Sequence, residues 1–152
     1  MASLVTLTYS QPSRSLAPGE VLITEGSPGG TLYVLEDGRL SVERGGVVIA
    51  TISEPGALIG EMSVLLGTHN TATVRAEKAS GVRVVKDAIR YLERQPEVAL
   101  RVATVLAARL DKTSKVLVDL QSEHKDKPEQ HGLLSRLASS LFYQGSQESE
   151  PG

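Results

Sequence analysis

The stretch Gly60-Glu61-Met62-Ser63-Val64-Leu65-Leu66-Gly67-Thr68-His69-Asn70-Thr71-Ala72-Thr73-Val74 decides the fold and the candidate site of this chain. We interpret it as a short apolar helix opened by Gly60-Glu61, a turn at Gly67-Thr68, and a strand that begins at Thr71. The first turn of a helix has backbone N–H groups without an intrahelical acceptor, and the helix dipole favours negative charge there. The stretch therefore predicts a pocket for one small anion, with the Glu61 carboxylate beside it as a hydrogen-bond acceptor.

Short β-rich runs alternate with glycine turns over residues 1–86. Asp37-Gly38 and Gly45-Gly46 suit tight hairpins, because these residues tolerate positive φ. Besides the strand that begins at Thr71, we expect strands over residues 21–24, 32–35, 40–43, 47–52 and 82–85. Short strands at this regular spacing are typical of a sandwich or barrel. We therefore expect an α+β fold, in which an antiparallel β-barrel (a jelly roll, or double-stranded β-helix) over 1–86 is followed by C-terminal helices.

The pattern becomes helical over residues 87–121. A short helix over 87–94, with Asp87 as its acidic N-cap, precedes a longer helix that starts at Gln95-Pro96-Glu97. The longer helix carries residues at the alternating three- and four-residue spacing of a heptad seam. They are Ala103, Leu106, Leu110, Thr113, Leu117 and Leu120. This seam either packs on the barrel or pairs with a second copy over 96–121, and the sequence leaves both interpretations open.

Residues 122–152 form a third segment. We expect a charged linker over 123–130, an amphipathic helix over 132–143, and a Gly/Ser/Glu-rich disordered tail over 144–152. The amphipathic helix could cover the barrel, fold against a second subunit or bind another protein. The sequence does not choose among these partners.

Composition narrows the classes of function. A net charge of −2 argues against nucleic acid as an electrostatic partner, and the absence of cysteine excludes disulfides and thiolate chemistry. There is no Ser/His/Asp signature and no loop for a nucleoside triphosphate, so we expect no catalytic site and no enzyme. The three histidines do not pair on a strand, so we expect no metal site; they are His69, His124 and His131. No stretch approaches the roughly 20 apolar residues that span a bilayer, and residues 1–7 lack the basic region and long apolar run of a signal peptide, so we expect a cytoplasmic protein without membrane contact.

Four motifs, in order between residues 16 and 85, resemble those of the cyclic-nucleotide-binding domain family. They are the first turn and strand at 18–22, a Gly-rich turn and strand at 26–35, a Gly-centred hairpin at 38–40, and the phosphate-binding cassette at 60–74. The long helix is similar to the central helix of the catabolite activator protein-like members. The resemblance implies a jelly roll that binds a cyclic nucleotide as ligand and needs no cofactor.

The resemblance also implies a role for each residue of the cassette. Gly60 would allow close approach of the backbone to the ligand, and Glu61 would bind the ribose 2′-hydroxyl. Backbone N–H groups near Met62 and Ser63, and at Thr71, would bind the cyclic phosphate, and the Thr71 hydroxyl could add a further bond.

Thr113 and Ser114 match positions at which catabolite activator protein-like members contact adenine across a dimer interface. Their hydroxyls can both donate and accept, as an adenine edge requires. The resemblance therefore implies a homodimer through the helix over 96–121, and it favours cyclic AMP over cyclic GMP. Too few residues follow that helix for a winged helix-turn-helix, so we expect no DNA binding.

Asn70 departs from the family, which places an arginine at this position to neutralise the phosphate. The loss of one charge-assisted hydrogen bond costs about 1.5–3 kcal/mol, which weakens binding roughly 10- to 100-fold. Two hypotheses follow. The chain is a stand-alone cyclic-nucleotide sensor that acts by rearranging its C-terminal helices, or it is a degenerate domain that no longer binds nucleotide tightly and serves as a dimerisation or protein-docking module.

Overall fold

The computed structural model describes residues 2–123 and 128–142, and the chain divides into two compact units. Residues 1–102 form the first unit, which holds the β-strands of the described chain, and residues 103–152 form the second. The helices are α1 (Leu4–Leu7), α2 (Glu61–Leu66), α3 (Ala88–Arg94), α4 (Pro96–Glu123) and α5 (Pro128–Phe142). In the described part of the chain, no helix is long and apolar enough to cross a membrane.

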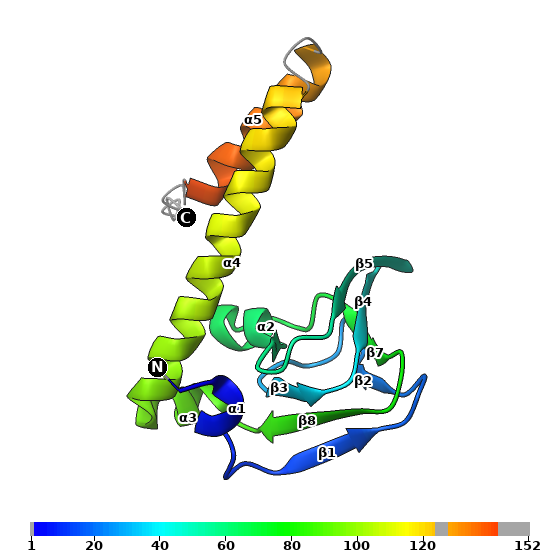
Figure 1. The fold of residues 1–152 in the computed structure, drawn as a ribbon, viewed down its shortest axis with the longest axis vertical. Coiled ribbons are helices and arrows are strands. Elements are labelled where there is room, and N and C mark those ends of the chain that lie inside the picture. Colours follow the sequence, from blue (N-terminus) through cyan, green and yellow to red (C-terminus); the bar gives the residue numbers. More distant parts are fainter. Residues whose placement is uncertain (1, 124–127, 143–152) are drawn as a thin grey trace, which may run out of the picture. The chain divides into compact units, whose positions relative to one another are not determined.

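Two four-stranded sheets build the first unit (Figure 1). Their strands are β1 (Ser13–Leu16), β2 (Val21–Ile23), β3 (Leu32–Asp37), β4 (Leu40–Arg44), β5 (Val47–Ile52), β6 (Leu58–Ile59), β7 (Thr73–Ala76) and β8 (Ser80–Val85). One sheet has the order β1-β8-β3-β6 and the other β2-β7-β4-β5, and every ladder is antiparallel. This jelly-roll-like sandwich with helices after it confirms the expected fold class.

The core of the first unit is aliphatic and draws on both sheets. Leu35 and Val82 from one sheet and Leu40 from the other are fully buried in a single cluster. Each lies on a strand where buried residues are interspersed with more exposed ones, which is how a strand presents one face to a core. The two sheets are therefore held together mainly by the burial of Leu, Ile and Val side chains.

The sequence pattern missed two strands and misplaced the start of a third. β1 was not predicted because its Ser13-Arg14-Ser15 run is exposed and only Leu16 is buried, so it shows no apolar alternation. β6 is two residues long and too short to carry a pattern. β7 begins at Thr73, not at Thr71, since residues 71 and 72 still belong to the loop.

The segment before β1 is tied to the sheet by Arg83 of β8. Its Nη1 atom donates to the backbone oxygens of Tyr9 and Gln11, at 2.9 Å each, and its Nε lies 3.0 Å from Glu36 Oε1. Four residues of α1 precede this tie. This guanidinium adds to the burial of Leu4 and Thr8 in holding the N-terminal segment.

The helical part differs from expectation in two places. Asp87 precedes α3 but does not cap it: its φ is 49°, its side chain makes no capping bond, and its carboxylate instead lies 3.6 Å from Arg90 Nε. The predicted linker over 123–130 is wrong at both ends, because Glu123 closes α4 and α5 already begins at Pro128. Residues 124–127, and the predicted tail over 144–152, lie outside the described residues.

In the second unit α5 runs beside the C-terminal part of α4 (Figure 1). Leu134 of α5 is buried, and Leu117 and Leu120 of the predicted seam are half-buried. Leu110 and Thr113 of the seam are exposed. Pairing of this seam with a second copy stays a prediction.

Candidate functional site

The short helix α2 lies between two glycines, as the sequence predicts. Gly60 precedes it with a φ of 81°, and a Cβ atom there would lie 2.8 Å from the backbone oxygen of Thr31. Glycine is therefore required at position 60 both by conformation and by space. Gly67 ends the helix with a φ of 66°, and the N–H of Thr68 donates to the Ser63 oxygen at 3.1 Å.

Both polar residues of α2 are buried, together with Val64, whereas its other three apolar residues are exposed. Glu61 and Ser63 have 6% and 4% of their surface exposed, whereas Met62 has 51%. The Ser63 hydroxyl donates to the Gly60 oxygen at 2.9 Å. The backbone N–H groups of this first turn have no acceptor within the helix, and the dipole favours an anion beside them. The geometry thus presents N–H donors and a buried carboxylate at one end of α2.

Asn70 joins the loop after α2 to the Gly-rich turn at residues 26–30. Its backbone N–H donates to Ser27 O at 2.9 Å, and its backbone oxygen accepts from Gly26 N at 2.8 Å. Its side-chain Nδ2 donates to Ser27 Oγ and to Pro28 O, both at 3.1 Å. The amide that replaces the family's arginine is thus directed at the neighbouring turn.

Gly29 of the same turn packs against α2 and the start of the loop that follows it. A Cβ atom there would lie 2.5 Å from Thr68 O, 2.6 Å from Ser63 Cβ and 2.7 Å from Ser63 Oγ. Only glycine fits this contact without displacing its neighbours. Sequence reasoning missed these turn residues as part of the site, because it used the Gly-Ser-Pro-Gly-Gly run only as a turn before a strand. That run was the available signal.

Arg75 of β7, which follows the loop after α2, makes its contacts away from that loop. Arg75 donates from Nη1 to Gly19 O at 3.1 Å and has its Nε 3.8 Å from Glu43 Oε1. His69 and Thr71 are exposed. Among the described residues no group of three or more His, Cys, Asp or Glu side chains could hold a metal ion.

Tyr33 of β3 lies beside the start of α2. A Cβ atom on Gly60 would be 3.8 Å from Tyr33 Cδ2. Burial of the phenol raises the pKa of Tyr33, against a smaller opposing effect of the Arg14 charge.

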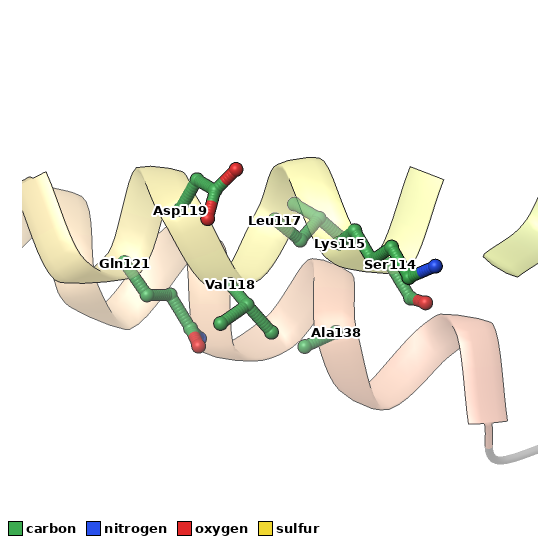
Figure 2. Close-up of a pocket in the computed structure, with 7 residues that line it drawn as sticks. All are labelled: Ser114, Lys115, Leu117, Val118, Asp119, Gln121 and Ala138. Carbon is green, nitrogen blue, oxygen red and sulfur yellow. The ribbon is translucent and has the colours of Figure 1, made fainter. Parts of the chain in front are cut away.

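Six of the eight predicted site residues lie on α2, at its N-cap or on the loop that follows it, and the other two lie in the second unit. Thr113 Oγ1 donates to Arg109 O and Ser114 Oγ to Asp111 O, both at 2.9 Å. Ser114 also lines an apolar groove of about 270 Å³ between α4 and α5, together with Leu117, Val118 and Ala138 among others (Figure 2). Their predicted contact with a base stays a prediction.

A family model described as the cyclic nucleotide-binding domain matches residues 13–90, which is half of the chain and includes the whole of the site around α2. The chain belongs to the cyclic-nucleotide-binding domain family. The match confirms the resemblance seen in the motifs.

Relatives of this cyclic-nucleotide-binding domain are regulatory proteins. It is 27% identical over 125 residues to the CRP-like cAMP-activated global transcriptional regulator of Mycobacterium tuberculosis, which covers 78% of this chain and 56% of that protein. Among solved structures, the catabolite activator protein of Thermus thermophilus aligns with a TM-score of 0.63 and 29% identity, over 78% of this chain and 58% of that one. The cAMP-bound PfPKA-R aligns with a TM-score of 0.56 and 26% identity, over 72% and 36% respectively.

These likenesses show a cyclic-nucleotide-binding domain of the catabolite activator protein type. The chain spans about half the length of the curated relatives that it matches first.

Proposed function

We propose that this chain is a sensor that binds cyclic AMP at the cassette around α2 and reports it by rearranging its C-terminal helices. The observation that carries the proposal is the first turn of α2, where buried Glu61 lies at the helix N-terminus, within the range that the family model matches. Two relatives support the choice of ligand, since one is described as cAMP-activated and the other is cAMP-bound.

Each cassette residue has a role in this proposal. The N–H groups of Met62 and Ser63 and the N–H and hydroxyl of Thr71 bind the cyclic phosphate, and Glu61 accepts a hydrogen bond from the ribose 2′-hydroxyl. Gly60 brings the backbone close to the ligand. The helix dipole balances part of the phosphate charge in place of a guanidinium. The affinity should therefore lie roughly 10- to 100-fold below that of a cassette with arginine.

Thr113 and Ser114 supply the preference for adenine, from the α4 helix of a second copy. Both hydroxyl hydrogens are already donated to carbonyls of the same helix, so the oxygens are left as acceptors. The amino group on adenine is a donor, whereas guanine carries a carbonyl acceptor at the equivalent position. An acceptor pair therefore favours cyclic AMP, and the exposed Leu110 beside it on the seam supports pairing of two α4 helices.

One observation favours the alternative of a degenerate docking module. Asn70 carries no charge, and both hydrogens of its amide are donated within the protein. A cassette of this kind could have lost its ligand and kept its fold. Binding measurements separate the two functions.

The test compares Glu61→Gln with Glu54→Gln, a matched control at an exposed glutamate outside the cassette. Because Glu61 is assigned to the ribose hydroxyl, its neutral variant should bind cyclic AMP at least about 10-fold more weakly, and the control should bind like the wild type. The readout is the rise in unfolding temperature with cyclic AMP concentration, which follows the affinity by mass action. Equal responses of both variants would contradict the assigned role of Glu61.

A further inference from the structure

We propose that Asn70 is a positioning residue: it clamps the loop between α2 and β7 to the Gly-rich turn and so holds the cassette in its binding geometry before the ligand arrives. This inference rests on the proposed function, because Thr71 on that loop is assigned to the phosphate. It gives the residue that replaces arginine a role of its own.

The direction of each hydrogen bond makes the carboxamide specifically required. The Ser27 hydroxyl donates to Thr24 O at 2.5 Å, so its oxygen is left to accept from Asn70 Nδ2. Pro28 O can only accept, and it receives the second amide hydrogen. Both partners therefore need a donor, and only a short side chain with two N–H groups supplies both from this place. A carboxylate or a methyl group at position 70 would lose both bonds.

The turn that Asn70 contacts is also held by two other contacts, one to the start of β7 and one to α2 and the residue Thr68. The N–H of Glu25 donates to Thr73 Oγ1 at 3.0 Å, where β7 begins. On the other side, Gly29 lies directly against Ser63 of α2 and Thr68. Asn70 contacts the turn between these two anchors, so the clamp closes the loop over its full length. The loop then has less conformational freedom to lose when a ligand binds.

Preorganisation offsets part of what the missing guanidinium costs. A mobile loop loses conformational freedom on binding, at about 0.5–1.5 kcal/mol for each immobilised side chain, and a clamped loop avoids most of this loss. The cassette of this chain thus exchanges a charged contact with the ligand for a fixed array of N–H donors.

The experiment uses the full chain with Asn70→Ala, Ser27→Ala and the double variant, and His69→Ala as the matched control at an exposed neighbour. Amide hydrogen exchange without ligand is the first readout. In Asn70→Ala the amides of Thr68 and residue 70, which donate to Ser63 O and Ser27 O in the wild type, should exchange at least about 10-fold faster, while Val82 in the core strand β8 stays protected. His69→Ala should leave all of these rates unchanged.

Affinity for cyclic AMP is the second readout, and a merely structural role would not move it. Asn70→Ala should bind about 10-fold more weakly, and adding Ser27→Ala to it should cost less than Ser27→Ala costs alone, because the two side chains share a bond. Arg83→Met, which loosens the distant N-terminal segment, should lower the unfolding temperature without changing the affinity.

Exchange rates at Thr68 and residue 70 that are equal in wild type and Asn70→Ala would overturn the clamp. So would an Asn70→Ala affinity equal to that of the wild type. If the wild type binds no cyclic nucleotide, the proposed function fails, and the exchange rates still decide on the clamp alone.

Discussion

Replacement of Gly29 by alanine adds only one methyl group, but it should lower the unfolding free energy markedly because there is no space for that group beside the cassette. The added methyl group would lie 2.5 Å from Thr68 O and 2.6 Å from Ser63 Cβ, whereas carbon atoms pack at about 3.5–4.0 Å. Ser63 is buried and its hydroxyl is bonded to Gly60, so it cannot swing away. The turn or α2 must therefore shift by roughly 1 Å, and overpacking of this kind costs about 1–3 kcal/mol of unfolding free energy.

Gly81→Ala is the matched control for this prediction. A methyl group there meets only Asp37 Oδ1, at 2.6 Å, and Asp37 is an exposed side chain that can turn away. An alanine within a strand is also favoured over glycine by roughly 0.5–1 kcal/mol, so this variant should be neutral or slightly stabilised.

Thermal unfolding followed by circular dichroism measures both variants. A loss of about 1–3 kcal/mol should lower the midpoint for Gly29→Ala by roughly 5–15 °C, and the midpoint for Gly81→Ala should stay within about 3 °C of the wild type. Cyclic AMP should also stabilise Gly29→Ala less than the wild type, because Ser63 and Thr68 of the cassette must shift. Coinciding midpoints for the two variants would refute the close contact between the turn and the cassette.

Two further predictions concern the scaffold. Arg83→Met removes the guanidinium that binds the Tyr9 and Gln11 oxygens, so it should cost about 2 kcal/mol and expose the first dozen residues to proteolysis; equal proteolysis of variant and wild type would argue against this anchor. Burial raises the pKa of Tyr33, so its contribution to stability is complete below pH 10 and is lost as the pH rises through the folded-state value. Titration at 295 nm should show a late ionisation that Tyr33→Phe reduces, and an unchanged curve would contradict it.

The cassette could be predicted from the sequence because its signals are local. A glycine at each end of a six-residue, mostly apolar segment defines α2, and the strands with apolar alternation were found near their observed bounds. β1 escaped because it is polar along three of its four residues, and its place in the sheet depends on pairing with β8, nearly 70 residues further along the chain.

The clamp around Asn70 could not be predicted for a related reason. Asn70 and its partners Ser27 and Pro28 are more than 40 residues apart in the chain. No motif in either stretch predicts that the two come into contact. Comparison of position 70 with arginine revealed a missing charge. The structure adds that the Asn70 amide hydrogen-bonds the loop between α2 and β7 to the Gly-rich turn.

Calorimetric titration of the purified full chain with cyclic AMP, with cyclic GMP as the comparison, tests the central claim most directly. The account predicts measurable binding of cyclic AMP, in the micromolar range or somewhat weaker, and weaker binding of cyclic GMP. Absence of heat together with absence of thermal stabilisation at millimolar cyclic AMP, where even a weak site must raise stability, would contradict the sensor and leave the docking module as the function of this domain.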